Sequence, residues 1–169
     1  MYKKLTLLLV GLLTTLAATA GTPRGEKTLG PKIGYISHHS SVVAGLAFRY
    51  TFSEHVRVSP EIGCAFRNKD QDAFLVDINV HSPFGITGTD SRATIYPLLG
   101  MTFNSWNHKV TDPADDSRHT DHINRFGLNA GAGFDFRCTE SLMLNFEAKY
   151  TLVKSYSSFI ATVGISYIF

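Results

Sequence analysis

Alternating apolar and polar residues dominate the chain after its first twenty positions. Within residues 142–151, for example, Leu144 and Phe146 alternate with Asn145 and Glu147. A β-strand places successive side chains on opposite faces, so this period of two predicts strands that each carry one apolar face. Eight segments share the pattern, at residues 31–37, 42–52, 55–66, 73–81, 93–106, 125–137, 142–151 and 158–169.

The second face of these strands is unusual for a soluble sheet, whose water-facing side carries many Lys, Glu, Thr and Ser residues. Here it is rich in Gly and Ala, with single charges between them, five basic and four acidic. Charges taken out of water must be compensated, so the balance favours an internal network of ion pairs. The predicted members of this interior ionic network are Lys32, Arg49, Arg57, Glu61, Asp77, Asp135, Arg137, Glu147 and Lys149.

If the polar face is the interior, the apolar face looks outward into lipid. A sheet in hydrocarbon must close on itself, because an open edge leaves backbone groups unpaired. Most of the segments reach the roughly 9 to 11 residues that a tilted spanning strand needs. We therefore predict an all-β fold, an eight-stranded antiparallel up-and-down transmembrane β-barrel over residues 30–169. Pro60 lies inside one strand and requires a bulge or a local break in pairing.

Residues 1–20 have the features of a secretory signal peptide. Lys3 and Lys4 precede an apolar stretch at residues 5–16, and Ala18 and Ala20 provide a small-x-small cleavage site. The alternative is an N-terminal membrane anchor, for which the apolar stretch is short. Residues 21–29 are predicted to be a flexible leader.

Composition then narrows the class of protein. The chain has 16 basic and 14 acidic residues, and removal of the signal peptide takes away two lysines, so the mature chain is neutral. Neutrality argues against a nucleic-acid-binding protein. Only two cysteines are present, which excludes a disulfide scaffold and paired-cysteine zinc sites. Cys64 falls on the lipid-facing side and Cys138 in a turn, so we expect no bridge between them.

The C-terminal strand ends in a pattern typical of outer membrane insertion signals, formed by Thr162, Gly164, Tyr167 and the terminal Phe169. Residues 126–150, with their Gly- and aromatic-rich hairpin, resemble the last hairpins of small porin-family outer membrane barrels of the OmpX, OmpW and opacity-protein kind. The resemblance implies location in the outer membrane of a two-membrane bacterium. Its implied partners are outer membrane lipids and the assembly machinery, and it carries no shared catalytic motif.

The longest connection, residues 107–124, is predicted to be an outer loop and the best candidate for contact with a host or another cell surface. It contains His119, Asp121 and His122, which could bind a first-row metal. No regular spacing fixes them, and an acidic outer loop is usually only solvated. We therefore expect no metal and no cofactor.

Two other functions are alternatives to a structural or surface-interaction role, a lipid A-modifying enzyme and a narrow channel for small molecules. A lipid A-modifying enzyme would need a nucleophile, a base and an orienting acid. The pairs His39–Ser41 and His81–Ser82 have no evident acid, so no catalytic residue is expected. A narrow channel for small molecules is disfavoured because side chains fill an eight-stranded barrel. We expect a monomer with a packed polar interior and no open pore.

Overall fold

The computed structural model describes residues 22–37, 41–66, 71–86, 92–111, 118–153 and 157–169, with only the backbone described at 71–72, 106–111 and 118–123. Every regular element in these ranges is a β-strand. No helix in the described part is long and apolar enough to cross a membrane. The strands are β1 (Lys27–Ile36), β2 (Ser41–Ser53), β3 (Val56–Phe66), β4 (Gln71–His81), β5 (Phe84–Gly85), β6 (Ala93–Thr111), β7 (Arg118–Arg137), β8 (Leu142–Val153) and β9 (Ser158–Ile168).

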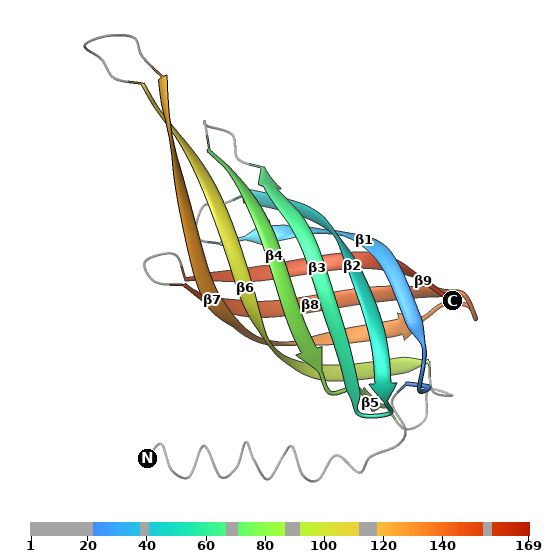
Figure 1. Cartoon of the computed structure of the whole chain (residues 1–169). Coiled ribbons are helices and arrows are strands. Elements are labelled where there is room, and N and C mark those ends of the chain that lie inside the picture. The colour runs from blue at the N-terminus through green and yellow to red at the C-terminus, as the bar shows by residue number, and fades with distance from the viewer. Residues whose placement is uncertain (1–21, 38–40, 67–70, 87–91, 112–117, 154–156) are drawn as a thin grey trace, which may run out of the picture.

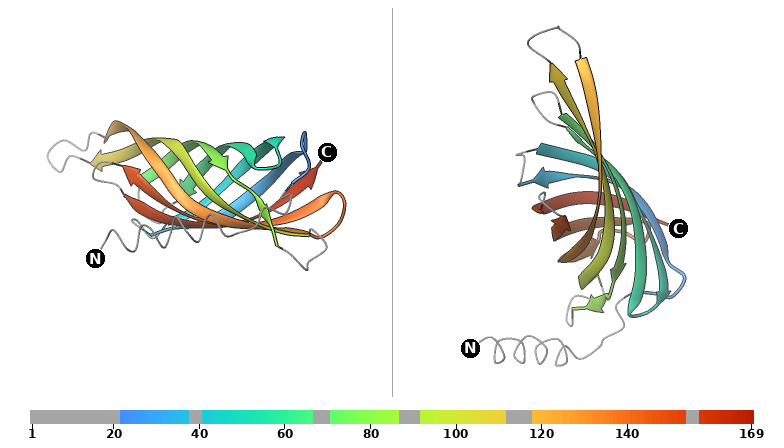
Figure 2. Two further views of the ribbon diagram at one scale, coloured as in Figure 1. Left: turned by 90° about the horizontal axis from the view of Figure 1, so that it is seen from below. Right: turned by 60° about the vertical axis from the view of Figure 1, so that its left-hand side comes forward.

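The eight long strands form one closed antiparallel barrel, as predicted. Neighbouring strands follow the order β4-β3-β2-β1-β9-β8-β7-β6, and pairing of β4 with β6 completes the ring. The first and last strands, β1 and β9, also pair with each other. The tilt of the strands around the ring is visible in Figure 1 and, from below, in the left view of Figure 2.

Burial alternates along each strand and confirms the inverted arrangement of faces. In β3, Glu61 is 3% exposed, whereas the next residue, Ile62, is 49% exposed. Large apolar side chains cover the outside of the barrel, including Leu99, Leu128 and Phe146. Polar and charged side chains fill the inside.

The barrel has two distinct ends. The end that holds Lys27 and Ile168 is called the terminal end, and the end from which β6 and β7 project is called the hairpin end. Near the hairpin end the lumen contains a layer of apolar side chains. The prediction of a packed polar interior was wrong for this layer, which consists of Ile36, Val43, Ala65, Ala73, Leu75 and Ile160.

The segment before the barrel is shorter than the predicted leader, because β1 begins at Lys27 rather than near Pro31. The preceding residues are also tied to the barrel. The Gly25 amide donates to the Thr51 carbonyl, and the Thr51 amide donates to the Glu26 carbonyl. Residues 27–29 therefore belong to the barrel, and the prediction of a flexible leader was wrong there. Residues 1–21, which include the predicted signal peptide, lie outside the described residues.

Two irregular features of the barrel, the long connection after β4 and Pro60 within β3, have simple explanations. The long connection after β4 contains the short strand β5, which pairs with β6. Pro60 produces no bulge in β3. The β2–β3 register is the same on both sides of it, and the pairs Phe48–Pro60 and Arg49–Ser59 are missing from the ladder. Of the two predicted consequences of Pro60, the structure shows the local break in pairing, and the same residues face the lumen on both sides of it.

The connection predicted as a loop at residues 107–124 is mostly strand. The backbone of β6 and β7 stays paired from Ala93–Phe136 as far as Thr111–Arg118. Neighbouring strands end earlier: β4 begins to pair with β6 at His108, and β8 pairs with β7 only up to Gly127. The two strands therefore project beyond the rest of the barrel (Figure 1; Figure 2, right view).

Candidate functional site

The lumen holds two clusters of buried ion pairs, and the first is built around Asp135 of β7. Its two carboxylate oxygens accept hydrogen bonds from different strands. Arg49 Nη1 donates to Oδ1 at 2.9 Å, and Arg57 Nη1 donates to Oδ2 at 2.7 Å. Asn145 Nδ2 also donates to Oδ1 at 2.9 Å. Asp135 thus joins β2, β3, β7 and β8 across the lumen.

The second cluster is built around Lys149 of β8. Its ammonium group lies 2.9 Å from Glu61 Oε2, 2.7 Å from Asp77 Oδ2 and 3.5 Å from Glu147 Oε1. Lys32 of β1 also pairs with Glu61. A small cavity beside this cluster has space for about one water molecule. Its lining also includes Val43, Leu75 and Ile160 of the apolar layer.

Eight of the nine predicted network residues lie in these two clusters, four basic and four acidic. All eight side chains are at most 12% exposed. The ninth, Arg137, lies at the terminal end, is 28% exposed and pairs with Glu26. Glu26 is not among the predicted network residues, because it lies in the segment predicted to be the leader.

Tyr96 of β6 links the Asp135 cluster to Glu147 and was missed as a site residue. Arg49 Nη2 donates to its hydroxyl at 3.2 Å, and that hydroxyl donates to Glu147 Oε2 at 3.4 Å. Arg57 lies 4.6 Å from the ring centre in a cation–π contact, and His81 stacks on the ring at 4.5 Å. The alternation along their strands places Tyr96 and His81 on the inward face, and this was the signal in the sequence that could have identified them.

Inward-facing glycines make room for side chains that reach over a whole strand. Tyr96, Gly133 and Glu147 occupy one row across β6, β7 and β8. A methyl group added at Gly133 would overlap the Tyr96 ring and hydroxyl. The bare backbone of Gly133 therefore lets Tyr96 lie across β7 and reach Glu147.

The same arrangement occurs at Gly100. Asn79, Gly100 and Asn129 are registered partners across β4, β6 and β7. Asn129 Nδ2 donates to Asn79 Oδ1 at 3.1 Å, directly over Gly100. Thr151 on β8 then donates to Asn129 Oδ1 at 2.9 Å. Glycine thus permits hydrogen bonds between strands that are not neighbours.

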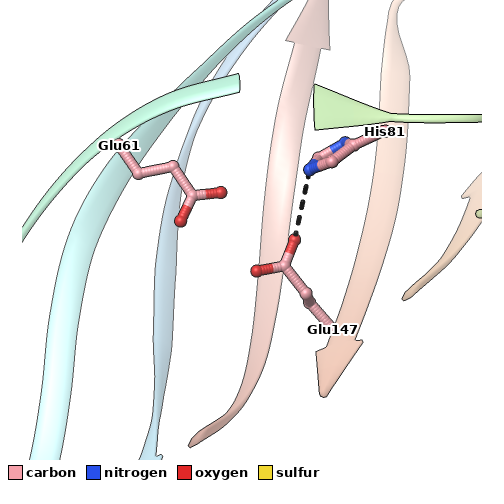
Figure 3. Close-up of side chains that lie close together, drawn as sticks. All are labelled: Glu61, His81 and Glu147. Atoms are coloured by element: carbon pink, nitrogen blue, oxygen red, sulfur yellow. Dashed lines mark ion pairs between the residues drawn. The ribbon is translucent and has the colours of Figure 1, made fainter. Parts of the chain in front are cut away.

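Glu61, His81 and Glu147 converge closely enough to raise the question of a metal site, as Figure 3 shows. Arg57 Nε lies 3.2 Å from His81 Nδ1. Arginine can only donate, so Nδ1 accepts and the proton of the neutral imidazole is on Nε2. That nitrogen, 3.9 Å from Glu147 Oε2, then has no lone pair for a metal. The four cations nearby already balance the acids, so the geometry fits an ionic network and not a cation site.

The other candidate residues are not assembled into a site among the described residues. The side chain of His81 interacts with Arg57, Tyr96 and Glu147, and not with its predicted catalytic partner Ser82. Cys64 and Cys138 are both free and exposed. His39 lies outside the described residues, as do the side chains of the metal alternative, His119, Asp121 and His122.

The C-terminal residues predicted as an assembly signal complete the barrel. Gly164 and the half-buried Thr162 face the lumen, whereas Tyr167 and Phe169 are on the outside, 58% and 59% exposed. The Phe169 amide donates to the Lys27 carbonyl at 3.0 Å, so the last residue pairs with the beginning of β1.

Comparison with known proteins agrees with this geometry. The model of a family described as outer membrane protein beta-barrel domain matches residues 5–169. The chain belongs to this outer membrane β-barrel family. Family membership places the protein in the outer membrane, with the apolar outer surface of the barrel in lipid. A search of curated protein sequences finds no match.

Several solved structures share the fold of this outer membrane barrel. The N-terminal β-barrel domain of OprF from Pseudomonas aeruginosa is 14% identical, with a TM-score of 0.67 over 88% of this chain and 100% of that one. Ail, the attachment invasion locus protein of Yersinia pestis, is 16% identical, with a TM-score of 0.62 over 87% and 100%. Neisserial surface protein A is 12% identical, with a TM-score of 0.65 over 85% and 96%.

Proposed function

We propose that this outer membrane barrel is a non-enzymatic surface protein that contacts a host or another cell through the projecting β6–β7 hairpin. The observation that carries the proposal is the length of β6 and β7, which extend beyond the neighbouring strands β4 and β8. Beyond the part of β8 that the structure describes, the β7 edge from Arg118 to Ile123 has no registered β8 partner. Such an edge offers backbone N–H and C=O groups to an added strand.

The remaining features support this role over the two alternatives. The buried ion pairs and the apolar layer both obstruct the lumen, so we infer that the barrel has no open pore. His81, a member of the candidate catalytic pair His81–Ser82, accepts a hydrogen bond from Arg57 and stacks on Tyr96. We further propose that the signal peptide at residues 1–20 directs export, that the hairpin end faces outward, and that the barrel acts as a monomer.

Among the similar structures, Ail has also been solved in complex with the heparin analogue sucrose octasulfate. Heparin therefore serves as the probe for this chain. The test compares the wild-type barrel, in lipid nanodiscs, with a variant whose residues 109–120 are replaced by Asn-Gly. His108 and Asp121 are registered partners, so a two-residue turn can close the shortened hairpin.

We expect the wild type to bind immobilised heparin and the shortened variant to lose at least tenfold in affinity. The barrel itself should be unaffected, because the β4–β6 ladder is retained up to Gln71–His108. Circular dichroism and heat-dependent gel mobility of the variant provide the folding control. Equal binding by both proteins, or binding by neither, would count against the proposal.

A further inference from the structure

The ladder between β1 and β9 closes the barrel and is interrupted in its middle. Thr28 and Leu29 pair with Ile168 and Tyr167, and pairing resumes only at Lys32–Gly164. The register is the same on both sides, so two rungs, Gly30–Ser166 and Pro31–Ile165, are absent. This ladder also has fewer registered pairs than any other between two long strands in the described residues.

The missing rungs follow from Pro31. In an antiparallel ladder, the N–H and C=O groups of one residue point to the same neighbour. The Ser37 amide donates to Phe159 O of β9, and the Phe169 amide donates to Lys27 O. Every second residue of β1, Pro31 included, therefore points toward β9. Proline has no N–H, so it cannot donate to the Ile165 carbonyl.

Two features make this loss more consequential here than in water. The side chains around the gap, such as Ile33 and Ile165, are about half exposed on the lipid-facing surface. Hydrocarbon offers no water to replace the missing bond. The space is also tight, because a methyl group at Gly30 would overlap the Ile165 carbonyl. The strand edges therefore meet closely at a point where the Pro31 donor is missing.

Pro60 provides a matched comparison elsewhere in the barrel. It breaks the β2–β3 ladder in the same way, with two missing rungs and an unchanged register. However, β2 and β3 are joined by a two-residue turn, whereas no turn connects β1 and β9. Separation of β1 from β9 requires no rearrangement of a hairpin.

We propose that the barrel opens first along the β1–β9 seam, and that the absent N–H of Pro31 sets how readily it opens. The seam is closed at its two ends by the Ser37–Phe159 and Lys27–Phe169 hydrogen bonds. Between them, Lys32 contributes side-chain pairs with Glu61 and, at 3.9 Å, with Glu147 of β8. Opening exposes the edges of β1 and β9 and gives lipid access to the lumen.

Site-resolved amide exchange of the barrel in detergent micelles tests the proposal. We expect the seam-facing amides of Ile33 and Tyr35 to exchange faster than those of the β7–β8 ladder. Pro31→Val restores a donor and should slow that exchange about fivefold, the effect of one added hydrogen bond. Pro60→Val should leave the seam amides unchanged. Wild-type seam amides that exchange no faster than the β7–β8 ladder would overturn the proposal.

A cross-link provides a second test that does not depend on proline. In a background with both native cysteines replaced by serine, Ile33→Cys with Val163→Cys bridges the seam, and Leu46→Cys with Ile62→Cys bridges β2 and β3. Oxidation should slow heat unfolding on gels several-fold more for the seam pair than for the control pair. Equal effects of the two cross-links would contradict opening at the seam.

Discussion

Asp135→Asn is expected to destabilise the folded barrel by about 3 to 5 kcal/mol. The substitution keeps the shape of the side chain but removes the negative charge that Arg49 and Arg57 share. Both guanidinium groups are buried, so Arg57 would lose its carboxylate partner and Arg49 would be left with Glu147, at 3.8 Å. Urea unfolding in detergent micelles, followed by circular dichroism, measures the loss.

Arg137→Gln is the matched control for this charge removal. Its partner Glu26 lies at the terminal end, and Arg137 itself is partly exposed. Arg137 is 28% exposed but Glu26 only 6%, so water screens one side of the pair, and the cost should stay below that of Asp135→Asn. If Asp135→Asn proved no more costly than Arg137→Gln, the Asp135 cluster would not stabilise the barrel as described.

Gly133→Ala is expected to cost about 2 to 3 kcal/mol, within the usual range for overpacking a filled interior. The added methyl group would occupy the space of the Tyr96 ring. The Tyr96 side chain could no longer lie across β7, and its contacts with Arg49 and Glu147 would be lost together. The same urea titration measures the effect.

Gly63→Ala is the matched substitution at another inward-facing glycine. Its added methyl group would meet Ala44 O at 3.3 Å and Val43 Cγ2 at 3.6 Å, beside the small cavity. We expect a change of about 0.5 kcal/mol or less, because a shift of a few tenths of an ångström relieves the one tight contact, with Ala44 O. Equal costs at the two positions would show that the row of Tyr96, Gly133 and Glu147 is not closely packed.

The sequence predicted the number of long strands and the direction of each face because both follow from local alternation. Arg57, Glu61 and Ile62 show their orientation through their neighbours in the chain alone. Proline positions were harder to interpret. The consequence of Pro60 depends on which partner strand its nitrogen faces, and that is a property of the ladder.

The partners within the lumen could not be predicted in the same way. Arg57 meets Asp135, 78 residues away, because the tilt of the strands brings them to one level of the barrel. Tyr96 acts as a link only because Gly133 leaves space in the neighbouring strand. The hairpin at residues 107–124 was missed because its polar, acidic residues lack the apolar alternation that indicates a strand in lipid.

The central claim is that the apolar face of the barrel lies in lipid and the polar face is enclosed. The two native cysteines test it directly, since Cys64 lies on the lipid-facing surface of β3 and Cys138 in the turn at the terminal end. Nitroxide labels are attached singly, in Cys138→Ser and Cys64→Ser variants in lipid bilayers, and their collisions with oxygen and a water-soluble nickel chelate are measured. A label on Cys64 should be accessible to oxygen and shielded from nickel, and one on Cys138 should show the reverse. Strong nickel accessibility of the Cys64 label in a folded barrel would contradict the account.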